Sequence, residues 1–391
     1  MIPPELKKDY SLKWERMQEF MQKECIDGCL LTIDVNLLYT TGKIYDGYFY
    51  LPQQGEPWFF IRKPNGWSGE HIVYIRKPEQ LPEVFTANRL EMPESLLLEA
   101  DELSYNEYVR LTNIFNPGKK ENATAMLRRM REIKTPYEIA QIRKCARLHS
   151  KTYSEIKGCF RSGMTDIELQ YEIERIMRKN GSLGVFRTFG KNMEIFMGSI
   201  LAGAENGAAP SPFDFALGGK GLDASIPLGA NGTVLKPGMS VMIDMAGNFT
   251  PYMTDMTRTF SVGKLAEPAY RAHQVSIEIH QTVMNIAKPG ISCAELYNIA
   301  AEIVERNNLS AYFMGSKQQA KFVGHGIGLQ INELPVLTPR SKEVLQPDMV
   351  FALEPKFVIP DTGAVGIENS YLVTGNGVEK LTVFPEEIIE F

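Results

Sequence analysis

Residues 241–263 read VMIDMAGNFTPYMTDMTRTFSVG, and two aspartates in this segment each lie next to an apolar, strand-like run. An apolar run leads into Asp244, Gly247-Asn248 and Thr250-Pro251 are turn signals, and a run rich in Thr, Phe and Val follows Asp255. This pattern predicts a β-hairpin with one carboxylate on each strand, the two lying across from each other. A carboxylate at the end of an apolar strand is costly to bury alone, so the pair needs a cation between them.

The C-terminal third supplies three more groups of this kind. His325 lies among glycines in Gly324-His325-Gly326-Ile327-Gly328, where backbone and metal can approach closely. Glu354 and Glu368 each belong to an apolar, strand-like run, and the turn at 360–363 predicts that the two runs pair. Two Asp, two Glu and one His suit a pair of divalent cations such as Mn, Co, Fe or Zn, and such a pair activates water for hydrolysis.

These motifs resemble the pita-bread metallopeptidase family, which includes methionine aminopeptidase, prolidase and aminopeptidase P. The resemblance rests on five positions that match in type, order and spacing: Asp244, Asp255, His325, Glu354 and Glu368. It implies an α+β pita-bread catalytic domain with an internal pseudo-two-fold repeat. It also implies a dinuclear-metal exopeptidase of the Xaa-Pro aminopeptidase or Xaa-Pro dipeptidase type, in which a hydroxide bridging the two metals attacks a short peptide.

The resemblance further assigns roles to the five positions. Asp244 and His325 are expected to bind different metals, and Asp255 and Glu368 are expected to bridge them. Glu354 is expected to bind one metal and to exchange a proton with the attacking water.

Four other residues are expected to assist these groups. Asn332 occupies the position of a histidine that stabilises the oxyanion in the family, and it can still donate a hydrogen bond there. Thr257 and Arg258 are expected to orient Asp255 from behind, and Glu333 is expected to support the site in a similar way.

Domain organisation follows from length and from helix signals. At 391 residues the chain is long enough for two domains. Helix–strand alternation over 1–133 predicts an α/β domain, and the run Gly28 to Gly42 resembles the domain that precedes the catalytic domain in creatinase and prolidase. Thr135-Pro136-Tyr137-Glu138 is a capping box with proline at the first helical position. We therefore predict a catalytic domain over 134–391.

An internal repeat supports the second domain independently of the metal ligands. Residues 162–169 precede a helix ending at Asn180, and residues 289–296 precede a helix ending at Asn307, with a constant offset of 127. Both stretches carry a Gly, a capping box and a following Leu in the same register. The repeat predicts two related α+β halves with a site between them.

Composition excludes several classes of protein. The net charge is −5, from 42 basic and 47 acidic residues, so the composition lacks the excess of basic residues that is typical of nucleic-acid-binding proteins. No apolar stretch is long enough for a membrane span. The five cysteines are odd in number and scattered, which indicates reduced, buried thiols in a cytoplasmic protein. The resemblance adds the expectation of a homodimer.

The chain departs from the family around the substrate. No histidine occurs between His149 and His273, where the family has one that receives substrate, and Gly366 replaces an arginine often found before the last Glu. The Gly-rich stretch 198–232 fits either a remodelled pocket wall or a surface loop. An alternative function therefore stays open, a same-fold hydrolase or lyase acting on a non-peptide small molecule. A non-catalytic binding module fits less well, because such relatives lose the ligands.

Overall fold

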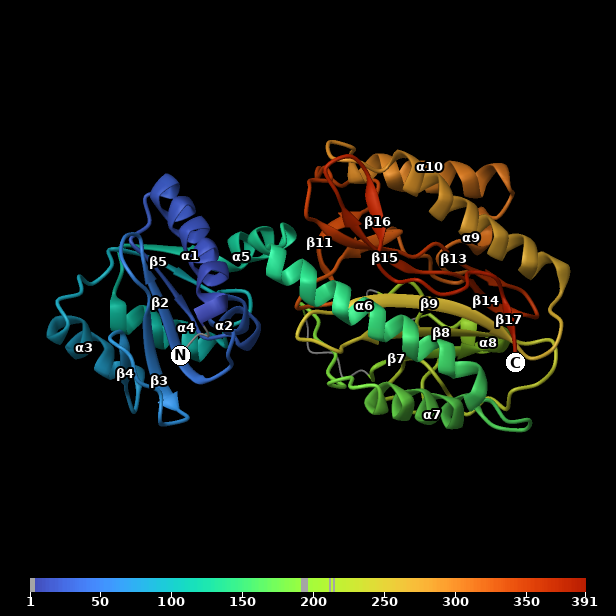
Figure 1. The fold of residues 1–391 in the computed structure, drawn as a ribbon, viewed down its shortest axis with the longest axis horizontal. Helices are drawn as coiled ribbons and strands as arrows, with labels where there is room; N and C mark the ends of the chain where they lie inside the picture. The colour runs from blue at the N-terminus through green and yellow to red at the C-terminus, as the bar shows by residue number, and fades with distance from the viewer. Residues whose placement is uncertain (1–3, 191–195, 211, 214) are drawn as a thin grey trace. The chain divides into compact units, whose positions relative to one another are not determined.

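A computed structural model describes residues 4–190, 196–210, 212–213 and 215–391. The chain divides into two compact units, Met1–Arg131 and Glu132–Phe391 (Figure 1). The predicted boundary at residue 133 lies two residues from this division, and independent folding of the first unit stays a prediction. Within the described ranges, no helix combines the length and the apolar character needed to cross a bilayer.

The N-terminal unit is a six-stranded mixed sheet with helices on both faces. The strand order is β4-β3-β2-β1-β5-β6. The strands are β1 (Gly28–Leu31), β2 (Asp46–Pro52), β3 (Trp58–Lys63), β4 (Ile72–Tyr74), β5 (Ser95–Leu98) and β6 (Lys119–Asn122). The helices are α1 (Pro4–Glu24), α2 (Asp34–Thr41), the short 3-10 helix η1 (Pro78–Gln80), α3 (Leu81–Ala87), α4 (Tyr105–Phe115) and α5 (Ala123–Glu132).

Alternation along the strands divides the side chains between two cores. In β1, Cys29 and Leu31 join a cluster with Trp14 of α1, whereas Leu30 joins a cluster with Phe85 of α3. The predicted α/β class of this unit is confirmed.

Glu99 follows β5 and lies completely buried where the parallel strands β1 and β5 end. Its carboxylate accepts hydrogen bonds from Thr32 N at 2.7 Å, Ile33 N at 3.0 Å and Asn36 Nδ2 at 2.7 Å. Burial raises the pKa of Glu99 to about 7, although these hydrogen bonds act in the opposite direction.

We expect the unfolding free energy of this unit to fall as the pH rises from 4.5 towards 7, by on the order of 3 kcal/mol. In that window the folded state keeps a proton on Glu99 that the unfolded state has released. All three tryptophans, at 14, 58 and 67, lie in this unit, so urea unfolding followed by tryptophan fluorescence measures it selectively. Glu99→Gln should remove this dependence and the exposed Glu83→Gln should keep it. An unchanged slope in Glu99→Gln would contradict the assignment.

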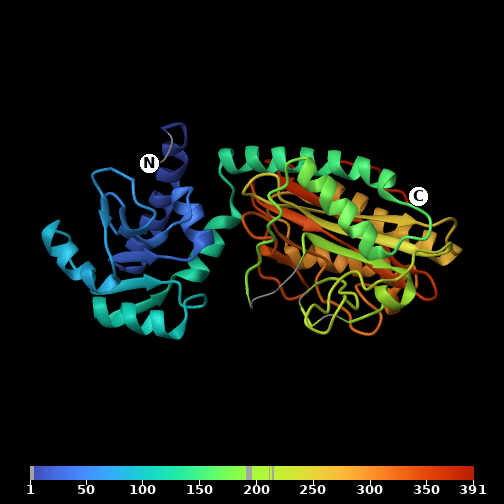
Figure 2. The same ribbon diagram turned by 90° about the horizontal axis from the view of Figure 1, so that it is seen from below.

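The C-terminal unit consists of two similar halves, each a pair of helices packed on antiparallel strands (Figures 1 and 2). In the first half, α6 (Pro136–Ile156) and α7 (Asp166–Lys179) cover a sheet of order β17-β9-β8-β7. Its strands are β7 (Gly198–Ala202), β8 (Ser240–Gly247), β9 (Thr254–Ser261) and β17 (Ile389–Glu390). The short helices η2 (Lys157–Cys159) and α8 (Gly203–Gly207) complete this half.

In the second half, α9 (Glu267–Ile286) and α10 (Cys293–Arg306) pack on strands in the same manner. One sheet has the order β11-β10-β12-β15-β16, and β13 pairs with β14 beside it. The strands are β10 (Gly324–Gly326), β11 (Glu333–Leu337), β12 (Val350–Leu353), β13 (Lys356–Ile359), β14 (Gly363–Gly366), β15 (Asn369–Val373) and β16 (Val378–Lys380). The 3-10 helix η3 (Ser310–Tyr312) follows α10.

Helices α7 and α10 confirm the predicted repeat. Both have 14 residues, and their C-terminal caps are Asn180 and Asn307. The predicted capping box forms at Thr165 of α7, but the prediction is wrong in detail for α10, where Ser292 accepts a hydrogen bond from Ala294 N instead of Glu295 N. The related halves bring β8 and β9 of the first next to β14 and β15 of the second.

The hairpin at 241–263 forms as β8 and β9, but its register differs from the prediction in one respect. Asp244 pairs with Thr257, and Asp255 pairs with Ala246, so the aspartates are diagonal rather than directly opposite. Because side chains at alternate positions share a face, this diagonal offset still places both carboxylates on the same side of the sheet.

Candidate functional site

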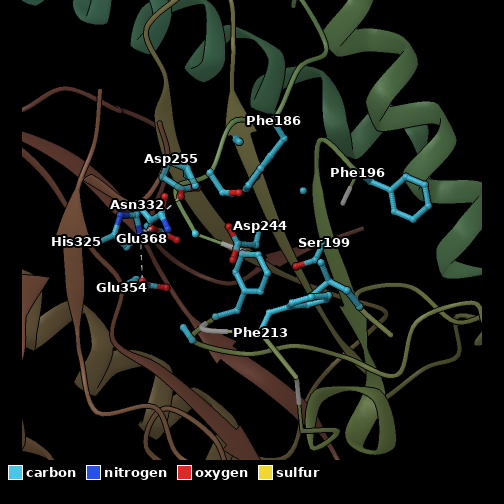
Figure 3. A pocket seen from close by; sticks show the side chains of 18 of the residues that line it. Phe186, Phe196, Ser199, Phe213, Asp244, Asp255, His325, Asn332, Glu354 and Glu368 are labelled. Atoms are coloured by element: carbon cyan, nitrogen blue, oxygen red, sulfur yellow. Dashed lines mark ion pairs between the residues drawn. The ribbon is translucent and has the colours of Figure 1, made fainter. Parts of the chain in front are cut away.

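The five predicted ligands come together at the ends and centres of five strands. Asp244 lies within β8, Asp255 within β9 and His325 at the centre of β10. Glu354 directly follows β12, and Glu368 directly precedes β15. Since Leu353 pairs with Asn369, the glutamates leave paired strand ends, as the sequence predicts. All five line one cavity of about 520 Å³ (Figure 3).

His325 faces three of the carboxylates. Its Nδ1 donates to the carbonyl oxygen of Gly326 at 3.2 Å, which leaves Nε2 pointing into the cluster. Nε2 lies 3.4 Å from Glu354 Oε1, 3.8 Å from Glu368 Oε1 and 3.9 Å from Asp255 Oδ2. One ligand atom each from Asp255, His325 and Glu368 lies within 4.8 Å of the others, an arrangement that fits a divalent ion.

The charges of this cluster are unbalanced. Burial and repulsion from Glu368 raise the pKa of Asp255. Burial also raises the pKa of Glu368 to about 8, because attraction to Lys356 offsets burial and repulsion from Glu354 only in part. Burial opposes protonation of His325, but the hydrogen bond and charge of Glu354 raise its pKa to about 9. Glu368 Oε1 is buried with no hydrogen-bond partner among the described residues. A cation bound between these groups would satisfy this oxygen and offset the repulsion.

A lysine that the sequence analysis missed lies on the other side of the cluster. Lys356 Nζ lies 2.8 Å from Asp244 Oδ2, 2.8 Å from Glu354 Oε2 and 2.9 Å from Glu368 Oε2. Its side chain is 1% exposed. Burial alone would lower the pKa of Lys356, but attraction to these carboxylates outweighs it and raises that pKa well above the usual value. In return, Lys356 lowers the pKa of Glu354 to about 2 against the effect of burial.

The sequence did contain a signal for Lys356. It stands two positions after Glu354, and in an extended chain the side chains at positions i and i+2 return to the same side. A lysine is seldom fully buried unless it is paired with a negative charge. A lysine at the start of an apolar run that follows a predicted ligand therefore indicates an ion pair with the carboxylates of the site.

The residues behind the ligands act on Glu368 rather than on Asp255, which corrects the expectation for Thr257 and Arg258. Thr257 Oγ1 donates to Glu368 Oε2 at 2.8 Å. The fully buried guanidinium of Arg258 donates to the carbonyl oxygen of Glu368 at 2.9 Å and to Asn369 Oδ1 at 2.8 Å. Asp255 is held instead through its backbone, whose N–H donates to Ser370 Oγ at 2.9 Å.

Asn332 and Glu333 lie near the cavity with partners of their own. Asn332 Oδ1 accepts from Phe189 N at 2.7 Å, and its Nδ2 donates to Phe189 O at 2.9 Å. Asn332 thus fixes the segment that carries Phe189 over the cavity, and its predicted contact with an oxyanion stays a prediction. Glu333 forms a buried ion pair with Lys134 at 3.0 Å, at the start of the C-terminal unit.

The rest of the cavity wall is mainly aromatic. Phe186, Phe196 and Phe213 line the cavity (Figure 3), and Phe189, Phe215 and Phe322 also belong to its lining. The Gly-rich stretch 198–232 supplies part of this wall through Gly198, Ser199, Pro212, Phe213, Phe215, Ala216 and Leu228. That observation favours the pocket-wall interpretation of this stretch.

The other histidines of this unit belong to the packing of the helices. His149 contacts Thr254 Oγ1 at 3.1 Å, His273 contacts the Glu386 carbonyl at 2.7 Å, and His280 lies 2.8 Å from the Tyr371 hydroxyl. Among the described residues that line the cavity, His325 is the one histidine.

Comparison with protein families gives two matches that follow the two units. Residues 140–375 match the model of metallopeptidase family M24, and residues 13–133 match that of the creatinase/prolidase N-terminal domain. Together they cover most of the chain.

Curated relatives and solved structures extend over nearly the full length. The chain is 27% identical over 381 residues to an Xaa-Pro dipeptidase of Pyrococcus horikoshii, covering 96% of this chain and 98% of that protein. It is 27% identical over 382 residues to an Xaa-Pro dipeptidase of Pyrococcus furiosus, covering 96% and 99%. The crystal structure of the Pyrococcus horikoshii prolidase superposes with a TM-score of 0.78 at 26% identity, covering 96% of this chain and 99% of that one.

Proposed function

The chain belongs to metallopeptidase family M24, and we propose that it is a metal-dependent exopeptidase acting on Xaa-Pro bonds, with the five predicted ligands in the lining of its aromatic cavity. The convergence of Asp255, His325, Glu354 and Glu368 is the observation that carries this proposal. Two relatives that match over 98% and 99% of their own length are named Xaa-Pro dipeptidases, which supports peptide substrates over the non-peptide alternative.

A divalent ion fits among Asp255, His325, Glu354 and Glu368, where an imidazole nitrogen and carboxylate oxygens face one another. Such an ion supplies Lewis-acid chemistry, since it polarises a carbonyl oxygen and makes water more acidic. Mn, Co, Fe and Zn all suit these ligands. The second ion of the predicted pair would need Asp244 together with the bridging Asp255 and Glu368, and Lys356 Nζ already contacts one oxygen each of Asp244 and Glu368.

Glu354 is placed to move the proton in this reaction. Its Oε2 is fixed by Lys356 Nζ, while its Oε1 faces the cavity beside His325. Attraction to Lys356 keeps Glu354 ionised, so Oε1 can accept a proton from water and later return it to the departing amine. His325 and Glu368 face Glu354 Oε1 across the position proposed for the metal ion.

The aromatic wall suits the apolar parts of the substrate. A prolyl ring and an apolar residue before it can pack against the side chains of Phe189, Phe213 and Phe322. Asn332 is proposed to donate to the developing oxyanion as well as to hold Phe189, so Asn332→Ala would disturb both.

The test is a panel of Xaa-Pro dipeptides and Xaa-Pro-Xaa tripeptides, assayed with chelator-treated protein before and after addition of Mn²⁺ or Co²⁺. We expect hydrolysis only after metal is added, faster when Xaa is apolar, and slower when alanine replaces proline. The absence of hydrolysis from every peptide, while metal analysis shows the ion bound, would contradict the proposal.

Cellular setting and assembly are part of the same proposal. All five cysteines are free, and four of them are buried, which is consistent with a reducing cytoplasmic compartment. A homodimer is proposed from the family resemblance alone, and light scattering on the purified protein measures it.

A further inference from the structure

The ammonium group of Lys356 occupies a position that a metal ion would otherwise take. A metal held by carboxylate oxygens lies about 2.0–2.2 Å from them. Lys356 Nζ already lies within 2.9 Å of one oxygen each from Asp244, Glu354 and Glu368. An ion bound to the same three oxygens would overlap the nitrogen, so the ion and the ammonium exclude each other.

Contacts of its side chain and of its backbone hold Lys356 in this position. An ammonium group has three N–H donors, and here each meets one carboxylate oxygen. Its backbone is fixed on both sides, since the carbonyl oxygen of Lys356 accepts from Met314 N at 2.8 Å and β13 pairs Lys356 with Gly366. A Cβ at Gly366 would lie 3.0 Å from the Cα of Lys356, so the two strands approach closely there.

In both Glu354 and Glu368, one carboxylate oxygen lies near Lys356 and the other lies near His325. Glu354 directs Oε2 to Lys356 and Oε1 to His325, and Glu368 does the same with its own two oxygens. Asp255 faces the histidine side at 3.9 Å, whereas Asp244 contacts the lysine. The cluster therefore has two cation positions, one filled by Lys356 and one lined by Asp255, His325, Glu354 and Glu368.

With a single ion, the cluster keeps one net negative charge. Four ionised carboxylates contribute four negative charges, Lys356 contributes one positive charge, and a divalent ion contributes two. The net charge is the same as that of four carboxylates with two divalent ions and one hydroxide. Lys356 and one ion thus bring the four carboxylates within one charge of neutrality, so a second divalent ion is not needed to offset their repulsion.

We propose that the metal centre is mononuclear, with Lys356 Nζ serving as a built-in second cation and Asp244 serving as its anchor rather than as a metal ligand. This inference rests on the proposed metal-dependent function, but it concerns the number of ions and not the substrate.

The experiment counts metal ions and examines their coupling. Chelator-treated protein is dialysed against Mn²⁺ and analysed for Mn per chain, and electron paramagnetic resonance separates an isolated Mn²⁺ from a spin-coupled pair. Wild type should bind one equivalent with an uncoupled spectrum. Lys356→Ala, which opens the occupied position, should bind two equivalents with a coupled spectrum. Lys134→Ala removes another buried lysine of this unit, paired with Glu333, and should stay at one.

The outcomes separate this inference from the proposed function. Two coupled ions in wild type would overturn the inference and leave a metal-dependent peptidase intact. One ion in both wild type and a folded Lys356→Ala protein would show that Lys356 is not the reason for the single ion. No bound metal at all would overturn both proposals. If Lys356→Ala does not fold, the count and the spectrum of wild type decide.

Discussion

Glu354→Gln is expected to lower the turnover of Xaa-Pro substrates by about 10²–10⁴-fold, the usual contribution of a positioned general acid–base group. The amide has nearly the shape of the carboxylate, so its oxygen can still accept from Lys356 Nζ. It cannot take up a proton from water, because an amide is not a base near neutral pH. Metal content should be retained in part, since Asp255, His325 and Glu368 are unchanged.

A matched control is Glu379→Gln on β16, a change of the same kind at a partly exposed residue paired with Arg143. Its turnover and metal content should equal those of wild type. The measurement is kcat with metal-saturated protein, together with metal analysis of each variant. A Glu354→Gln enzyme that keeps both metal and turnover would remove Glu354 from the proton transfer.

Lys356→Met is expected to lower the unfolding free energy of the metal-free C-terminal unit by about 3–5 kcal/mol, the range for removing one partner of a buried ion pair. Methionine keeps most of the volume of the side chain but leaves the buried Glu354 and Glu368 and the partly exposed Asp244 without their shared cation. Equilibrium unfolding by circular dichroism in the presence of chelator, with hydrogen exchange of the β8 and β13 peptides, measures the loss in this unit.

Lys134→Met is the comparison for that experiment. Lys134 is equally buried, and its ion pair is with one carboxylate, that of Glu333. We expect a smaller loss of stability, because fewer negative charges are left without compensation. A Lys356→Met protein as stable as wild type would show that the three carboxylates do not depend on the lysine.

The elements that position the site could be predicted because local sequence determines them. The turn signals between Asp244 and Asp255 give the hairpin β8–β9, and the helix caps at Thr165 and Ser292 give the repeated helices α7 and α10. The turn at 360–363 correctly indicated that the strands before Glu354 and after Glu368 pair. Each of these signals depends on neighbours within a few residues.

The features that the sequence analysis missed depend on contacts between distant segments. Lys356 acquires its role because oxygens of Asp244 and Glu368, 112 and 12 residues away, reach the same point. Thr257 donates to Glu368, 111 residues away, because β9 and β15 lie in contact. The clamp of Asn332 on Phe189 joins positions 143 residues apart. A side chain's type suggests its chemistry, but its partner is set by tertiary packing.

The mononuclear metal centre is tested by the hydrolysis of one Xaa-Pro dipeptide, measured while Mn²⁺ is added stepwise to chelator-treated wild-type protein. This centre predicts no hydrolysis before the addition and a rate that rises until one equivalent of Mn²⁺ per chain and then stays constant. A rate that keeps rising to two equivalents, or no hydrolysis with the ion bound, would contradict it.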